Sequence, residues 1–158
     1  MFELSQIKIT EDPEFIWEEY GITQEISDQL QKLHRGNISL SRGIYKRLQR
    51  GIKKYPKVPQ FKNHLAVYYE KVGKQEEAMK VIRNMLQQHP NYVHGIINYA
   101  NLPISEGDYK KAEEILKNGS TGDFLINEAF PHRDQFHIDE VFSYYGIVAQ
   151  IHAGRDEY

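Results

Sequence analysis

Residues 57–90 read KVPQFKNHLAVYYEKVGKQEEAMKVIRNMLQQHP, and this stretch decides the fold. From Pro59 onward, apolar residues recur at intervals of three and four, which is the spacing of one helical face. Gly73 interrupts the pattern, and a second stripe with the same spacing runs to about His89, just before Pro90. The stretch therefore predicts two consecutive amphipathic helices joined by a glycine turn.

Several positions of this stretch belong to a series that repeats with a period of 34 residues. A period of this length is typical of stacked helix-turn-helix repeats, in which one pair of helices cannot bury its apolar face alone. The recurring pairs are Pro56 and Pro90, Ala66 and Ala100, Gly73 and Gly107, Ala78 and Ala112, and Ile82 and Leu116.

This period, with its packing and turn residues, resembles the tetratricopeptide repeat family. Lys62 stands where the family usually has an aromatic residue, although Phe61 is adjacent. The resemblance implies an all-α fold, a right-handed α-α superhelix in which antiparallel helix pairs stack as a solenoid. The best-matching positions are Leu65, Ala66, Tyr69, Gly73, Ala78, Ile82 and Pro90.

We expect an acidic N-terminal arm over residues 1–21 and a repeat domain over 22–158. The arm should contain a short helix from Pro13, since an Asp-Pro pair is a good helix start, and its first ten residues should form an extended arm or a single edge strand. The expected parts of the repeat domain are units at about 22–56, 57–90 and 91–119, an insertion at 119–135, and a terminal helix at 136–153.

Three local expectations concern the later units. Pro103 should kink or end its helix near Leu102, because proline removes a backbone hydrogen bond. The apolar Phe124-Leu125-Ile126 of the insertion should fold under as a short helix. The segment from Ala153 to Glu157 resembles the turn that follows the first helix of a repeat.

Charge is distributed unevenly along the chain. Residues 1–28 carry eight acids and one base, whereas residues 29–69 carry ten bases and no Asp or Glu. We expect one of three roles for this basic stretch: neutralisation by the acidic arm or plain solvation, docking of an acidic protein, or binding of a nucleic acid. The bases on its predicted helix are Arg42, Lys46, Arg47, Arg50, Lys53 and Lys54.

The resemblance also implies a binding face. In the tetratricopeptide family the first helix of each pair lines a concave groove that receives a peptide, and asparagine side chains there can bind a peptide backbone whatever its sequence. A solvated polar face is the plainer interpretation of the same residues. The positions of this chain that match are Gln60, Asn63, Val67, Glu70, Lys71, His94, Ile97, Asn98 and Asn101.

Little in the sequence indicates catalysis. Cysteine is absent, and the seven histidines include no pair four residues apart and no HExxH motif. His132, His137 and Asp139 form the closest cluster, but their spacing fits a metal motif poorly. We expect no catalytic residue, metal or cofactor.

The expected function is a non-catalytic protein-interaction module or scaffold that binds a peptide or protein segment in its concave groove. The alternatives are a helical repeat protein that associates with nucleic acid through the basic helix, and the interaction region of a longer protein whose active part lies beyond Tyr158. No signal peptide or membrane span is evident, so we expect no membrane partner and a cytoplasmic location.

Overall fold

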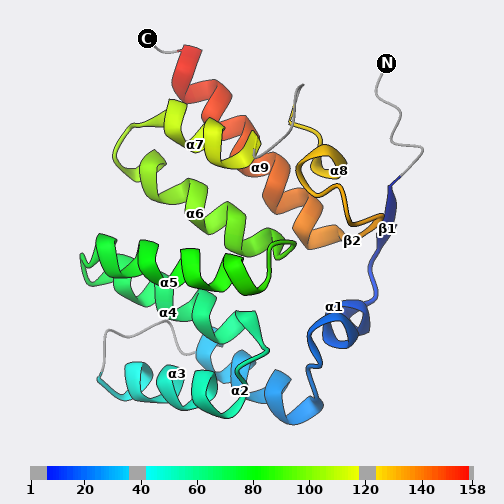
Figure 1. Cartoon of the computed structure of the whole chain (residues 1–158), viewed down its shortest axis with the longest axis vertical. Helices are drawn as coiled ribbons and strands as arrows, with labels where there is room; N and C mark the ends of the chain where they lie inside the picture. The colour runs from blue at the N-terminus through cyan, green and yellow to red at the C-terminus, as the bar shows by residue number, and fades with distance from the viewer. Residues whose placement is uncertain (1–6, 36–41, 118–123, 157–158) are drawn as a thin grey trace. The chain divides into compact units, whose positions relative to one another are not determined.

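The computed structural model describes residues 7–35, 42–117 and 124–156 (Figure 1). Within these ranges the chain forms nine helices and two short strands, which confirms the expected all-α class. None of these helices combines the length with the apolar character that crossing a membrane requires.

The described residues group into two compact units. One is Glu14–Pro90; the other joins the residues from Asn91 onward with those up to Pro13. The segment expected to form a single acidic arm therefore contributes to both units.

The unit Glu14–Pro90 consists of helices, and the two within residues 57–90 follow their predicted boundaries closely. Helix α3 packs against α4, and α4 packs against α5. The apolar stripes face inward as expected, with Phe61, Leu65, Ala78, Ile82 and Met85 all buried. Its helices are α1 (Pro13–Tyr20), α2 (Gln24–Arg35), α3 (Arg42–Lys54), α4 (Pro59–Lys71) and α5 (Gln75–Gln88).

Close approach of α3 and α4 requires a glycine. A Cβ atom at Gly51 would lie 2.4 Å from the ring of Phe61, so only hydrogen fits there. The Phe61 ring is 1% exposed and stacks on the Tyr55 ring, with 5.8 Å between centroids and 15° between planes. The glycine thus lets the backbone of α3 lie directly on an aromatic ring of α4.

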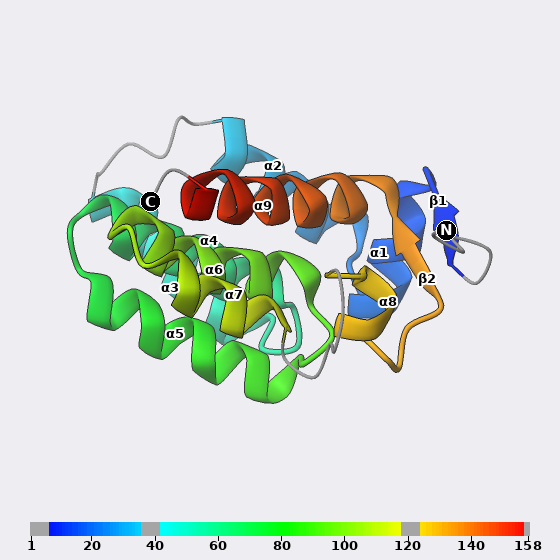
Figure 2. The ribbon, with the colours of Figure 1, turned by 90° about the horizontal axis from the view of Figure 1, so that it is seen from above.

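The second unit contains four helices and a small parallel sheet. Helix α9 packs against both α6 and α7 (Figures 1 and 2). Strand β1 pairs with β2, with Ile9 opposite Phe136. Its elements are α6 (Val93–Ser105), α7 (Tyr109–Lys117), α8 (Ile126–Ala129), α9 (Ile138–Asp156), β1 (Lys8–Thr10) and β2 (Gln135–His137).

The α4–α5 and α6–α7 hairpins turn in the same way. Gly73 and Gly107 have φ angles of 75° and 79°, a region that residues with a side chain rarely adopt. Each glycine N–H donates to the carbonyl three residues earlier at 3.0 Å, and the next N–H reaches the carbonyl five residues before it, at 2.8 Å and 2.9 Å. This pattern closes the C-terminal end of a helix. The 34-residue interval between the glycines thus reappears as a repeated backbone turn.

Helix α6 does not end near Leu102. It continues to Ser105, with Pro103 buried inside its last turn. The carbonyl of Pro103 accepts the N–H groups of Glu106 and Asp108, at 3.1 and 2.9 Å. Near a helix end the missing proline N–H removes only one bond, and these turn contacts close the helix beyond it.

The end of the chain also differs from expectation in two places. Residues Gln135–His137 form β2, so the terminal helix begins at Ile138 rather than at 136. The helix then continues through Gly154 instead of turning there. This glycine leaves space for the ring of Tyr109, which a Cβ would approach within 2.2 Å. A short helix, α8, does form in the insertion, but it begins at Ile126, so Phe124 and Leu125 precede it. Phe124 and Ile126 are buried, as expected of residues that fold under.

Gly51→Ala is expected to lower the free energy of unfolding by about 1–3 kcal/mol, because the new methyl group overpacks the Phe61 ring. Gly146→Ala, in α9, is the matched control: its Cβ meets nothing within 4 Å, so alanine should add up to about 1 kcal/mol through helix propensity. Urea unfolding followed by circular dichroism measures both. Equal effects of the two changes would contradict this account of the α3–α4 contact.

Candidate functional site

The residues expected to line a concave groove are divided between two helices. Five lie on α4 and four on α6, and these helices belong to different units, so a shared groove stays a prediction. On α4, Lys71 is exposed and the other four are half-buried. On α6, His94, Asn98 and Asn101 are half-buried.

Two residues of the expected α6 face have surroundings unlike a solvated groove. Ile97 is only 7% exposed, so its side chain belongs to the packed interior; α6 has two neighbours, α7 and α9, and buries more than one face. Burial lowers the pKa of His94, while the nearby Glu140 carboxylate opposes that shift.

The basic surface of α3 is present as expected. Ile44 and Leu48 are buried on the inner side, and the cations lie on the outer sides. Only the Arg42 side chain lies outside the described part of the chain. The exposed cations are Lys46, Arg47, Arg50, Lys53 and Lys54.

The acidic N-terminal segment neutralises one of these cations, Lys54. Glu25 Oε1 lies 2.8 Å from Lys54 Nζ and accepts a hydrogen bond from the Tyr55 hydroxyl at 2.9 Å. The hydrogen bond from Lys54 lowers the pKa of Glu25, and the same bond raises the pKa of Lys54. Within the described residues, Lys46, Arg47, Arg50 and Lys53 have no ion-pair partner.

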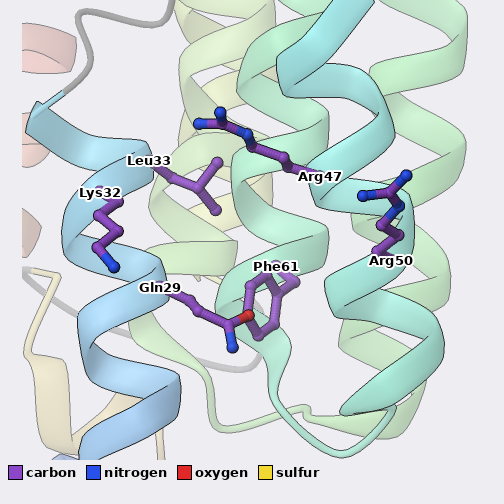
Figure 3. A pocket seen from close by; sticks show the side chains of 6 residues that line it. All are labelled: Gln29, Lys32, Leu33, Arg47, Arg50 and Phe61. Atoms are coloured by element: carbon purple, nitrogen blue, oxygen red, sulfur yellow. The ribbon is translucent and has the colours of Figure 1, made fainter.

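A cavity of about 350 Å³ opens where α2, α3 and α4 meet. Figure 3 shows Gln29 projecting from α2 toward Phe61, and Arg47 extending from α3 toward α2. Leu33 and Phe61 supply apolar surface, while Lys32, Arg47 and Arg50 supply positive charge. We call this the first cavity; its lining is Gln29, Lys32, Leu33, Arg47, Arg50 and Phe61.

The apolar wall of the first cavity is held in place by its neighbours. Phe61 is fixed between Tyr55 and Gly51. The Tyr55 hydroxyl accepts a hydrogen bond from Gln29 Nε2 at 3.4 Å and donates one to Glu25. Because these contacts already exist in the free chain, a ligand would meet a preformed wall at little ordering cost.

The charge of the first cavity is of one sign. Among the residues that the structure describes, no carboxylate lines it, and the sequence has no Asp or Glu between residues 29 and 69. Near a protein surface, two unit charges 4 Å apart interact by about 4 kcal/mol at an effective dielectric constant of about 20. The arrangement is suited to a ligand that combines an apolar group with negative charge.

The other unit holds a buried ion pair. Arg133 donates to both carboxylate oxygens of Glu140, at 3.0 and 2.9 Å, and to the carbonyl of Asn91 at 3.1 Å. Glu140 also accepts the backbone N–H of His137 at 2.9 Å, and His137 Nδ1 accepts that of Asp139 at 3.2 Å. These reciprocal bonds form a capping box at the start of α9, so the polar groups serve the fold.

Two members of the histidine cluster noted in the sequence, His137 and Asp139, belong to this cap. His137 is buried and Asp139 is exposed, and His132 is exposed nearby in the sequence. In the described ranges, no three His, Asp or Glu side chains come together in a way that could hold a metal ion.

Sequence reasoning identified the cations of α3 but missed the partners that complete the first cavity. Gln29, Lys32 and Leu33 lie on α2, and Phe61 was taken only as a core residue. The absence of acids, which begins at residue 29, was the available signal. It did not reveal which side of α3 would face α2.

Comparisons with protein-family models, curated proteins and solved structures found no match to this chain.

Glu140→Gln is expected to lower the free energy of unfolding by about 3–5 kcal/mol, because it leaves the buried Arg133 charge without its partner. Asp134→Asn is the control: its side chain is 83% exposed and lies 3.9 Å from Lys8 Nζ, so the cost should stay below about 1 kcal/mol. Urea denaturation measures both variants. A Glu140→Gln chain as stable as the wild type would contradict the capping role.

Proposed function

We propose that this chain is a non-catalytic protein-interaction module, built of tetratricopeptide-like helix pairs, that binds an acidic segment of another protein. Support for the repeat comes from the α4–α5 and α6–α7 hairpins, whose turn glycines lie 34 residues apart and share one hydrogen-bond pattern. Ala78 and Ala112, also 34 residues apart, are both fully buried, as small packing residues of a repeat would be.

The first cavity is the observation that carries the proposal. Its apolar wall would accept a bulky side chain of the partner, and Lys32, Arg47 and Arg50 would attract the acidic residues beside it. The polar face of α4 and the polar face of α6 are, each by itself, further candidate surfaces for the same partner.

Nucleic acid is the alternative that the exposed cations of α3 favour, since such side chains could contact phosphates. Proteins that hold single strands also need an aromatic face on which a base can stack. Phe61 offers no free ring face for a base, because Tyr55 stacks on its ring and the backbone at Gly51 lies against it. The protein segment is therefore the better-supported partner. A role as the interaction region of a longer protein fits the same binding function.

Binding should depend on the cavity cations. We expect Arg47→Gln combined with Arg50→Gln to weaken binding of a fluorescent peptide, one phenylalanine flanked by aspartate and glutamate, by about tenfold or ~1.4 kcal/mol. Lys110→Gln, an exposed lysine on α7, removes charge elsewhere and should change affinity less than about twofold. Fluorescence anisotropy on the full chain measures each affinity.

Two further probes separate the alternatives. Replacing the phenylalanine of the peptide by serine should weaken binding if its ring enters the cavity. Single-stranded and duplex oligonucleotides, titrated with salt, test the nucleic-acid alternative. Oligonucleotides that bind more tightly than the peptide, with a steep salt dependence, would replace the proposed function.

A further inference from the structure

A second cavity, of about 270 Å³, lies along α3, α4 and α5. Its apolar surface comes from one residue of each helix: Ile52 of α3, Leu65 of α4 and Val81 of α5. Lys62 and Lys80 also line it, and no carboxylate from the described part of the chain does. The second cavity therefore repeats the chemistry of the first: an apolar wall beside positive charge.

Two amide groups orient the Lys62 ammonium group without neutralising its charge. Its Nζ donates to the amide oxygen of Asn84 at 3.2 Å and to that of Gln88. Partial burial lowers the pKa of Lys62, which is the expected effect when no carboxylate compensates for lost water. An acidic group arriving at this cavity would supply the missing negative charge.

The two cavities lie on opposite flanks of α3. At 3.6 residues per turn, Arg47 and Arg50 of the first cavity point about 160° away from Gln49 and Ile52 of the second. The exposed face of α3 between these flanks carries Lys46 and Lys53. The opposite face carries the buried residues Ile44 and Leu48. A ligand that reaches both cavities must therefore cross the basic outer face of α3.

We infer that the partner is an extended acidic segment that crosses α3 and places one bulky apolar side chain in each cavity. The inference rests on the proposed function and adds a second anchor and a spacing. A helix with its side chains is about 10–12 Å wide, and an extended chain advances about 3.3 Å per residue. Side chains alternate between the faces of an extended chain, so anchors four residues apart, spanning about 13 Å, suit both cavities.

Charge complementarity favours an acidic protein segment as the ligand of this surface. The path from one cavity to the other is lined by cations from four helices, and residues 29–69 contribute no acid to it. The apolar wall of the first cavity is formed by Leu33 and by Phe61, whose ring is stacked on Tyr55. The apolar wall of the second cavity is formed by aliphatic side chains alone. A flexible protein segment can bring separate apolar side chains and carboxylates to such a surface.

The test uses three fluorescent peptides of equal length and charge: phenylalanines four residues apart, phenylalanines two residues apart, and a single phenylalanine. On the full chain at about 0.15 M salt, where screening acts beyond about 8 Å, we expect the four-residue spacing to bind at least tenfold more tightly than either other peptide. Equal affinity of the two doubly anchored peptides would overturn the spacing.

Matched variants assign each anchor to its cavity. Lys80→Glu changes an exposed residue of the second cavity and should weaken the four-spaced peptide about fivefold, while the single-phenylalanine peptide changes less than about twofold. The double arginine variant, Arg47→Gln with Arg50→Gln, should weaken both peptides. Lys110→Glu is the control for added negative charge, and circular dichroism checks that each variant folds.

The outcomes separate this inference from the proposed function. If the single-phenylalanine peptide binds through Arg47 and Arg50 but Lys80→Glu changes no affinity, the second anchor is wrong and the interaction module stands. If none of the peptides binds the wild-type chain, the proposed function and the inference both fall.

Discussion

The contact between the Phe61 ring and the backbone of Gly51 is the constraint on which the unit Glu14–Pro90 depends. A side chain at residue 51 would occupy the position of the ring, so the α3–α4 distance is set by the absence of a Cβ. Tyr55 then stacks on the same ring and carries the hydroxyl that Glu25 and Gln29 hold from α2. One aromatic ring thus links three helices, and the two cavities flank the helix that it fixes.

Unbalanced charge is the second feature of this unit. Glu25, from the acidic segment, forms an ion pair with Lys54 of α3, and Lys54 lines neither cavity. The cations around the cavities therefore keep their mutual repulsion in the free chain. An acidic ligand would relieve that repulsion as well as gain its own contacts, which links the charge pattern to binding.

In the unit that begins at Asn91, the buried polar residues stabilise the fold. Arg133 donates to the Asn91 carbonyl, which joins the segment before α9 to the segment before α6, and its ion-pair partner Glu140 caps α9. Arg133 further lies over the Phe136 ring, 4.6 Å from its centroid. The Arg133–Glu140 pair is buried, whereas the cations that line the two cavities of the other unit have exposed or half-buried side chains. The buried pair stabilises the fold, and the proposed ligand would bind the accessible cations of Glu14–Pro90.

The sequence by itself determined the helices and their turns, because apolar spacing, proline and glycine act within a few residues. It predicted α4 and α5 nearly to the residue, together with the basic face of α3. Only tertiary structure decided which side of α3 meets α2, that Gln135–His137 pairs with β1, and that Gly154 is a packing site. These outcomes depend on contacts between segments distant in the chain, and local periodicity carries no information about them.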